Sequence, residues 1–230
     1  MGIPQYLAMT DGEIAACARL PPRLARMGCH FSDDGLVGLP QALPSGALLV
    51  VDDRVPMAAQ DPEHILDQLA EALEKLSCTG LLLDFQQAEN APQRELVRLL
   101  ARELTVPLAA PPAYAAEGCR LFLPPVAADQ TVEEALSPWA GKKIWLDTAP
   151  AAVRLELTKQ GCTRTPLPRM AASGKFKDPG LCCRYSIEPT LNGGFQFTLY
   201  RDRCCIEAIL EQAAAFGAEL AVGLSQEWET

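Results

Sequence analysis

The stretch that decides the fold is TGLLLDFQQAEN, residues 79–90, in which a run of leucines ends on one acid and two amides. A short apolar run of this kind is typical of a strand that is covered on both faces. Because side chains alternate along a strand, Asp84 and Gln86 share one face with Leu82, and the residues between them point the other way. Polar groups at the end of a buried strand predict a pocket there. A network of Asp–amide hydrogen bonds that closes the strand end is the alternative.

Similar apolar runs occur along the whole chain, and helical patterns lie between them. Asp61 and Pro62 are the start signals of one helix, Asn90 is that of another, and Gly217 is the stop signal of a last one. Eight strands with intervening helices predict a closed (β/α)₈ barrel, the TIM-barrel architecture. A doubly wound open sheet is the alternative. The expected strands lie within residues 4–9, 28–33, 47–52, 80–86, 106–114, 119–125, 142–147 and 218–224.

One region, residues 162–200, departs from this alternation of strand and helix patterns. It contains a basic segment rich in Pro, Gly and Ser, followed by a hairpin pattern with Asn192-Gly193-Gly194 at its turn. We therefore expect a loop-and-hairpin insertion between the seventh and eighth strands of a single domain that spans residues 1–230. The basic side chains of the loop are either solvated or able to gate the barrel mouth; they are Arg169, Lys175 and Lys177.

Charge and cysteine content narrow the possible partners. The formal net charge of −9 argues against a nucleic-acid backbone and against an anionic membrane surface as partners. Nine cysteines, with no C-x-x-C spacing, favour free thiols over a disulfide framework or a zinc site. We expect no signal peptide and no phosphate-binding glycine loop from this sequence. We expect a cytoplasmic protein that uses no cofactor and no metal.

A family resemblance adds to this prediction. The segment ILDQLAEALEKLSCTGLLLDFQ, residues 65–86, resembles the helix and fourth strand of glycoside hydrolase family 18, the chitinase-like barrels. The family pattern D-G-x-D-x-D-x-E falls on residues 79–86. Gly80 and Asp84 match it, and Phe85 stands where an aromatic residue is usual. Two further segments resemble the family's fifth strand and its closing helix and strand, namely residues 108–114 and 200–224.

The departures from the family pattern bear on activity. Thr79 and Leu82 replace the first two acids, and Gln86 replaces the glutamate that protonates the leaving group. An amide has no labile proton to donate, and the loss of a general acid costs about 10²–10⁴-fold in rate. The sixth strand ends in Leu123-Pro124-Pro125 instead of a Tyr-Asp pair. Trp228 stands several residues beyond the place of the family's floor tryptophan.

Other acids and aromatic residues are candidates for the site. Asp147 ends the seventh strand and Glu227 follows the eighth, so both could converge with Asp84 at the barrel mouth. Two carboxylates about 5–9 Å apart could act as acid and base on a glycosidic bond. Tyr114 and Trp228 could contact a sugar ring.

A second acidic group follows the third strand. Asp52 and Asp53 could bind a cation or raise one pKa of the pair, although a loop cap that pairs with Arg54 is the alternative. His30 lies near the end of the second strand and is expected to be structural.

Three hypotheses for the function follow. The first is a chitinase-like barrel without its catalytic acid, which binds a carbohydrate or another small molecule through Asp84, Gln86, Asp147, Tyr114, Glu227 and Trp228. The second is an active glycosidase that uses relocated carboxylates, Asp84 and Glu227. The third is a structural or interaction protein with a closed barrel mouth.

Overall fold

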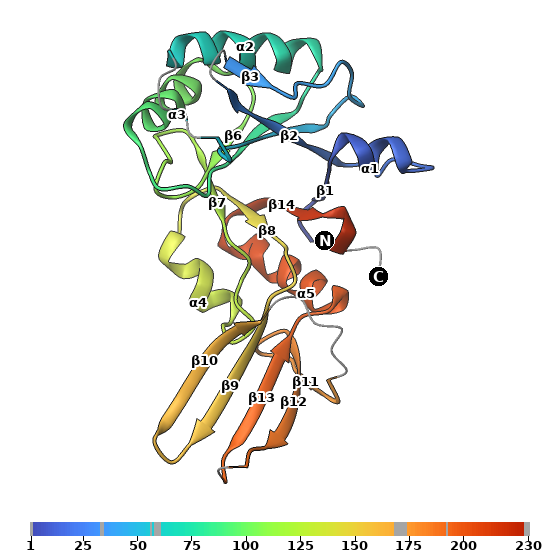
Figure 1. Ribbon diagram of the computed structural model, residues 1–230, viewed down its shortest axis with the longest axis vertical. Helices are drawn as coiled ribbons and strands as arrows, with labels where there is room; N and C mark the ends of the chain where they lie inside the picture. Colours follow the sequence, from blue (N-terminus) through green and yellow to red (C-terminus); the bar gives the residue numbers. More distant parts are fainter. Residues whose placement is uncertain are drawn as a thin grey trace.

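A closed barrel of eight parallel strands forms the main body of the protein (Figure 1). The computed structural model describes residues 2–32, 35–55, 57, 61–167, 174–191 and 193–227. Around the barrel the strands follow their order in the chain, and β1 closes the circle by pairing with both β14 and β2. The predicted barrel is therefore confirmed. Its strands are β1 (Gln5–Met9), β2 (Leu24–Ser32), β4 (Leu48–Asp52), β5 (Gly80–Asp84), β6 (Leu108–Ala110), β7 (Arg120–Leu123), β8 (Ile144–Asp147) and β14 (Ala218–Leu224).

Apolar side chains fill the barrel lumen. Trp145 is 1% exposed and packs there with Leu48 and Leu82. Gly80 makes room for this indole, since a Cβ at position 80 would lie 2.9 Å from a ring carbon of Trp145 and 3.1 Å from the carbonyl oxygen of Pro107. The lumen is thus a packed apolar core.

The layer of helices outside the barrel is incomplete. No helix occurs among the described residues between β2 and β4 or between β6 and β7, although helices were expected between all strands. After β2 the chain instead forms β3 (Gly35–Val37), which pairs antiparallel with β2. Within the described ranges no helix is long and apolar enough to cross a membrane. The helices are α1 (Asp11–Ala16), α2 (Pro62–Lys75), α3 (Ala91–Glu103), α4 (Val132–Leu136) and α5 (Arg203–Ala213), with single 3₁₀ turns η1 (Ser137–Trp139), η2 (Ala214–Phe216) and η3 (Ser225–Glu227).

The predicted helix boundaries are confirmed by their caps. The side chain of Asp61 accepts a hydrogen bond from the backbone N–H of Glu63 at the start of α2. Asn90 accepts one from Gln93 at the start of α3. Gly217 ends η2 in the left-handed conformation, with φ of 89°, which a residue without Cβ adopts at little cost.

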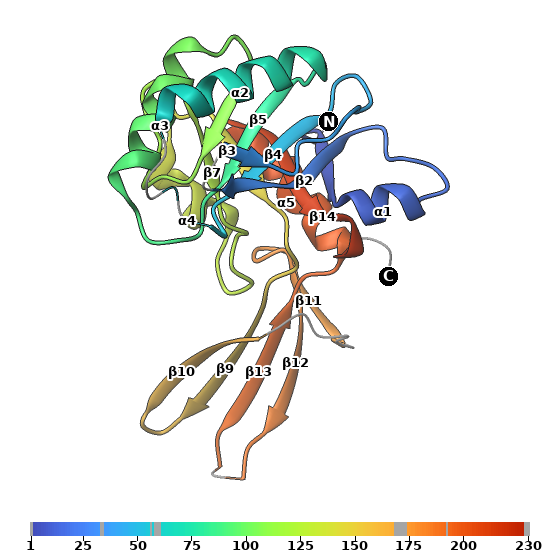
Figure 2. The ribbon, with the colours of Figure 1, turned by 45° about the horizontal axis from the view of Figure 1, so that its top comes forward.

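A five-stranded antiparallel sheet, here called the projecting sheet, lies between β8 and β14 in the chain and reaches away from the barrel (Figures 1 and 2). Its strands, in spatial order, are β10 (Gly161–Leu167), β9 (Ala152–Thr158), β13 (Phe195–Tyr200), β12 (Cys183–Pro189) and β11 (Phe176–Asp178). The expected hairpin is β12–β13.

The boundary predicted for this insertion is wrong at its start. Residues 161–167 form β10 where a loop was expected, and the sheet already begins at Ala152. The insertion therefore begins earlier than predicted, at Ala152 instead of residue 162. Arg169 of the expected basic loop and Asn192 of the expected turn lie outside the described residues.

Arg201 joins the projecting sheet to the barrel. Its side chain is 4% exposed and donates to the carbonyl oxygens of Gln130 at 2.9 Å, Leu181 at 2.9 Å and Cys182 at 3.3 Å, and to that of Val126. Burial lowers the pKa of this guanidinium. The arginine links the loop after β7 to the segment before β12, so the base of the sheet is fixed on the barrel.

Candidate functional site

Three aspartates point into the open end of the barrel from the carboxyl ends of its strands. Asp52 ends β4, Asp84 ends β5 and Asp147 ends β8. Each stands two residues after a side chain of the lumen core, and alternation therefore directs all three inward. This end of the barrel, here called the mouth, is where barrels of this type carry their functional groups. The inward orientation predicted for Asp84 is confirmed.

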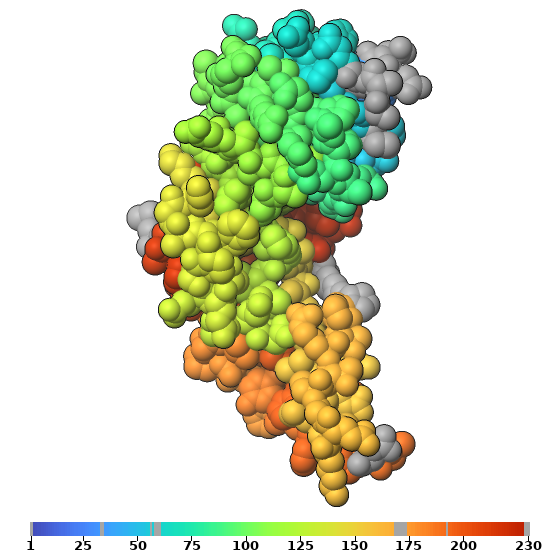
Figure 3. Space-filling model, turned by 90° about the vertical axis from the view of Figure 1, so that its left-hand side faces the viewer, coloured from blue at the N-terminus to red at the C-terminus, as the bar shows by residue number. Residues whose placement is uncertain are grey.

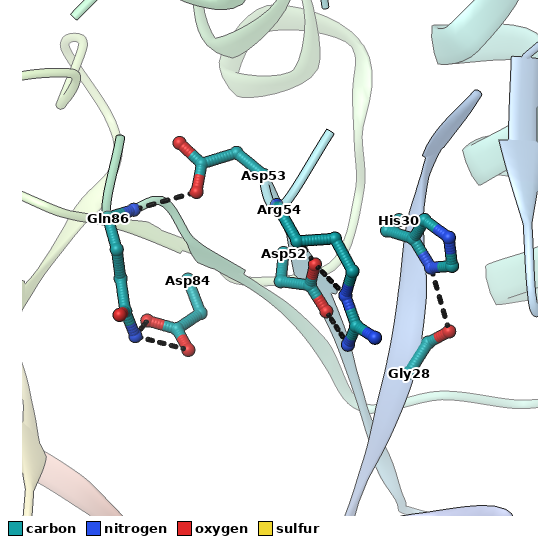
Figure 4. Close-up of polar contacts among 7 residues, drawn as sticks. All are labelled: Gly28, His30, Asp52, Asp53, Arg54, Asp84 and Gln86. Carbon is teal, nitrogen blue, oxygen red and sulfur yellow. Dashed lines mark hydrogen bonds and ion pairs between the residues drawn. The ribbon is translucent and has the colours of Figure 1, made fainter. Parts of the chain in front are cut away.

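Gln86 lies beside Asp84 at the mouth (Figure 4). Its amide nitrogen donates to both carboxylate oxygens of Asp84, each at 3.2 Å. Burial raises the pKa of Asp84 above its usual range, and the charges of Asp52 and Asp53 raise it further, whereas the hydrogen bonds from Gln86 lower it. The pair therefore consists of an acid that is reluctant to ionise and a neighbouring amide.

Asp53 holds the backbone that carries Gln86. It is 2% exposed, and its two carboxylate oxygens accept the backbone N–H groups of Gln86 at 2.8 Å and Gln87 at 3.0 Å. Gln93 donates a longer bond of 3.4 Å to the same carboxylate. The network continues from Gln93 to the hydroxyl of Tyr114 at 3.2 Å. Asp53 thus positions the turn after β5, a role that was not predicted from the sequence.

A signal for this network is present in the sequence. Alternation along β4 places Asp53 on the outer face of the strand, where a lone carboxylate needs a partner. Gln93 falls on the otherwise apolar inward stripe of α3, with Leu96, Val97 and Leu100. Two polar residues on facing buried surfaces indicate a hydrogen-bonded pair.

Arg54 forms an ion pair with Asp52, as predicted by the alternative that Asp52 and Asp53 form a loop cap. The guanidinium donates to the two oxygens of Asp52 at 2.7 and 2.5 Å (Figure 4). Burial alone would raise the pKa of Asp52, but the hydrogen bonds from Arg54 hold it below its usual range. His30 is half-buried, pairs in register with Asp52 and has Nδ1 3.3 Å from the carbonyl oxygen of Gly28. The structure therefore gives His30 a local backbone contact.

Asp147 and Glu227 lie near one another on the other side of the mouth. The pKa of Asp147 is raised to about 6, chiefly by burial and also by the charges of Glu227 and Asp84, while a hydrogen bond of 2.8 Å from the backbone N–H of Ala149 opposes the rise. Glu227 belongs to η3. The carboxylate of Glu13, on α1, accepts hydrogen bonds from the side chains of Ser225 at 3.1 Å and Gln226 at 2.9 Å, so it links η3 to α1. The charges of Asp84 and Glu227 thus both act on Asp147 at the mouth.

Replacing Asp147 by asparagine is expected to stabilise the protein at neutral pH. The folded-state pKa lies above the ordinary value of 3.8, so the folded state binds more protons, and the free energy of unfolding falls as pH rises from about 4 to about 6. Asp147→Asn removes this loss, which amounts to about 2–3 kcal/mol at pH 7.5. Urea denaturation of the wild type and the variant at pH 4.5 and 7.5 measures this difference in the free energy of unfolding.

The control for this prediction is Asp67→Asn, an exposed aspartate on α2. We expect no pH-dependent gain from it. An Asp147→Asn variant whose gain in stability is the same at both pH values, or which is destabilised at pH 7.5, would contradict the proposed burial of charge.

A cavity of about 260 Å³ opens at the mouth over β2, β4 and β5. Its volume is close to the lower end of the range of small-molecule sites. Its lining contains three acids, two amides and one arginine but no aromatic ring among the described residues. The lining residues are Met27, Val50, Asp52, Asp53, Arg54, Asp84, Gln86 and Gln87.

Two predicted site residues are not brought to the mouth by the described structure. Tyr114 is 3% exposed and packs edge-on against Phe85, with ring centroids 5.1 Å apart, in the core between barrel and helices. Its expected contact with a ligand is replaced by the Gln93 hydrogen bond. Trp228 lies outside the described residues.

Comparisons with known proteins agree with the barrel. No family model matches the sequence, and no curated protein sequence matches it. The crystal structure of a chitinase from Chromobacterium violaceum ATCC 12472 is similar with a TM-score of 0.60 over 98% of this chain and 95% of the other, at 11% identity. The Bacillus cereus spore cortex-lytic enzyme SleL gives a TM-score of 0.57 over 98% and 72%, also at 11% identity. At this identity the likeness concerns the fold alone, and the chain therefore has the barrel fold of chitinases and spore cortex-lytic enzymes.

Proposed function

We propose that this barrel binds a carbohydrate at its mouth and does not hydrolyse it by the mechanism that the family 18 resemblance implies. The observation that carries the proposal is the Asp84–Gln86 pair. Gln86 lies within hydrogen-bond distance of Asp84, where the resemblance puts a proton-donating glutamate. A carboxamide at that position can orient a ligand, but it cannot protonate a leaving oxygen.

The lining of the cavity supports a polar, hydroxyl-rich ligand. Carboxylates accept hydrogen bonds from sugar hydroxyls, and amides both donate and accept. Because no aromatic ring lines the described cavity, stacking adds nothing to the affinity there. We therefore expect weak binding, with a Kd on the order of 0.1–1 mM, which corresponds to about 4–5.5 kcal/mol. An open cavity argues against the hypothesis of a closed mouth.

The test is binding of amino-sugar oligomers to the intact protein, measured by thermal shift and by calorimetric titration. We expect the wild type to be stabilised by at least one oligomer and Asp84→Ala to lose the effect, because the carboxylate that faces the ligand is gone. Asp67→Ala, on the exposed face of α2, is the matched control and should bind like the wild type. Wild-type protein that is stabilised by none of the oligomers would refute the proposal.

A second candidate, a glycosidase with relocated carboxylates, is favoured by one observation. The raised pKa of Asp147, about 6, leaves this acid partly protonated near neutral pH, and the charges of Asp84 and Glu227 are close enough to contribute. An acid that keeps its proton beside a second carboxylate is the arrangement that general acid–base catalysis requires. Release of reducing sugar by the wild type, lost in Asp147→Asn, would support this candidate over simple binding.

A further inference from the structure

The projecting sheet has one apolar face and one polar face. Directly paired residues share a face, and on one side the paired residues of β9 and β13 are apolar: Leu155 with Phe197 and Leu157 with Phe195. On the other side they are polar: Arg154 with Thr198 and Glu156 with Gln196. An antiparallel sheet that alternates in this way packs its apolar face on a core. Figure 3 shows the outer end of the sheet standing clear of the barrel, so the barrel does not supply that core there.

The apolar face becomes more exposed with distance from the barrel. At the base it is covered, since Leu199 is 6% exposed and packs with Ala128 of the loop after β7. Farther out, Leu157 is 42% and Phe195 55% exposed, and Leu191 in the turn between β12 and β13 is 106% exposed. Of the eight large apolar side chains exposed in the described chain, five belong to this sheet and its turn: Leu157, Phe176, Ile187, Leu191 and Phe195. Such a concentration marks an interaction surface.

The five strands of the sheet carry no unpaired charge on their apolar face. Arg164, at the β10 edge of this face, forms an ion pair with Asp129 of the loop after β7. Asp178 accepts hydrogen bonds from two backbone N–H groups of the segment after β11, at 2.9 and 3.0 Å. Glu156 and Glu188 lie on the polar face. The face therefore has no charge that would select an ionic partner, and its complement is another apolar surface.

The apolar face has both a hollow and protruding side chains. A groove of about 330 Å³ runs over β9, β13 and β12 toward the base of the sheet. Its lining is apolar or aromatic except for Asp178: Leu155, Leu157, Asp178, Leu181, Cys183, Tyr185, Ile187, Phe197 and Leu199. Phe195 is not part of this lining and stands in the outermost row of the face, more than half exposed. A surface with an exposed aromatic ring and an apolar groove can be complementary to itself.

We propose that two copies of this chain dock face to face through the apolar faces of their projecting sheets. The two sheets run in opposite directions, so that Phe195 of each copy lies over the groove of the other. This contact is isologous and closes at two copies. It completes a sandwich of two layers, which lie about 10 Å apart in packed sheets. The opposite directions place the two barrels at opposite ends of the sandwich, where they do not collide.

The open area of the face is sufficient for such a dimer. Taking about 200 Å² for a fully exposed large apolar residue, the five exposed side chains of the sheet and its turn leave about 600 Å² open on each copy. Two copies would bury about 1,200 Å² from these side chains alone, which is the lower end of the range of specific interfaces. The dimer is therefore expected to be in equilibrium with the monomer at micromolar concentration.

Other contacts between copies fit less well. The exposed large apolar side chains of the barrel lie singly on three separate elements: Val37, Val55 and Leu224. The free edge of the sheet is unsuited to pairing with a further strand, because Pro166 in β10 has no N–H to donate.

The test is sedimentation equilibrium of the intact protein between about 1 and 100 µM, where a dimer of this kind dissociates on dilution. We expect the mass of one copy at the low end and of two copies at the high end. Leu157→Ser with Phe195→Ser should raise the dissociation constant about 100-fold or more, because both copies lose their largest outer apolar side chains. Glu156→Ser with Gln196→Ser changes the polar face of the same strands and is the matched control, expected to dimerise like the wild type. Circular dichroism confirms that each variant is folded.

Ile187 gives a test of the arrangement itself. It lies in the middle row of the face with Phe197 and Leu155. In sheets of opposite direction the two-fold axis follows this row, so Ile187 faces the same residue of the second copy. Ile187→Lys and Ile187→Glu should each be monomeric because like charges meet, whereas an equimolar mixture of the two should dimerise.

Three results would overturn the proposal. The first is a wild type that stays monomeric over the whole range, including one that co-sediments with phosphatidylcholine vesicles, which would assign the face to lipid. The second is a dimer that Leu157→Ser with Phe195→Ser leaves intact. The third is a mixture of Ile187→Lys and Ile187→Glu that remains monomeric.

Discussion

Gln86→Glu is expected to give the protein hydrolytic activity toward an unactivated amino-sugar oligomer that the wild type binds. The Gln86 side chain already reaches both oxygens of Asp84 at 3.2 Å, so a carboxyl group there would share a proton with Asp84. Like charges this close raise one of the two pKa values, and the introduced carboxyl group would keep a proton to donate. We expect a gain on the order of 10²-fold over the wild type, the lower end of the contribution of a general acid.

The gain is limited because the chain lacks other parts of the pattern it resembles. Leu82 takes the place of an acid in that pattern, and the sixth strand ends in residues 123–125, which contain no acid. Product analysis by chromatography measures the rate. The control is Gln86→Glu combined with Asp84→Asn, in which the shared proton and the gain should both disappear. Equal rates in the wild type and Gln86→Glu would show that position 86 is not where a proton donor acts.

Asp53→Ala is expected to cost about 2–4 kcal/mol of the free energy of unfolding. The substitution leaves the backbone N–H groups of Gln86 and Gln87 without their buried acceptor and also removes a partner of Gln93. Each unsatisfied buried donor costs about 1–3 kcal/mol. Binding at the mouth should weaken as well, since the backbone that directs Gln86 toward Asp84 loses its support. Urea denaturation and calorimetric titration measure the two effects.

The neighbouring aspartate provides the control. Asp52 pairs with Arg54, whose side chain is 57% exposed, so Asp52→Ala should cost less than about 1 kcal/mol. Asp53→Asn keeps one acceptor but turns an amide N–H₂ toward the donors. We expect its cost in free energy of unfolding to lie between those of Asp52→Ala and Asp53→Ala. A cost of Asp53→Ala as small as that of Asp52→Ala would mean that the Asp53 network does not hold the turn after β5.

The barrel could be predicted from the sequence because its strands are buried on both faces. The run Gly80–Asp84 shows this best, since Leu81 and Leu83 pack under the helices and Leu82 in the lumen. Local signals also defined the helix ends, as at Asp61. The single domain of residues 1–230 stays a prediction.

The hairpin β12–β13 of the projecting sheet was predicted, but β9 and β10 were missed although the signal of β9 was local. In β9, Val153, Leu155 and Leu157 alternate with Arg154 and Glu156, the period of a strand with one open face. A pattern search for strands buried on both faces passes over such a segment.

The mouth was predicted in part. Asp84 and Asp147 end their strands on the inward face, and alternation alone gives that result. Gln86 lies two residues beyond the end of β5, in the turn that Asp53 holds. Tyr114 was misplaced because it follows the end of β6, where the chain turns and alternation no longer specifies direction. The role of Asp53 depends on Gln93, forty residues away in sequence, and a contact of that kind requires the folded structure.

The most direct measurement of the central claim is a crystal structure of the wild-type protein with a bound amino-sugar oligomer. The account predicts the oligomer in the cavity over β4 and β5, in hydrogen-bond contact with Asp84 and Gln86 and with every glycosidic bond intact. An oligomer bound elsewhere on the protein, or cleaved products in the cavity, would contradict it.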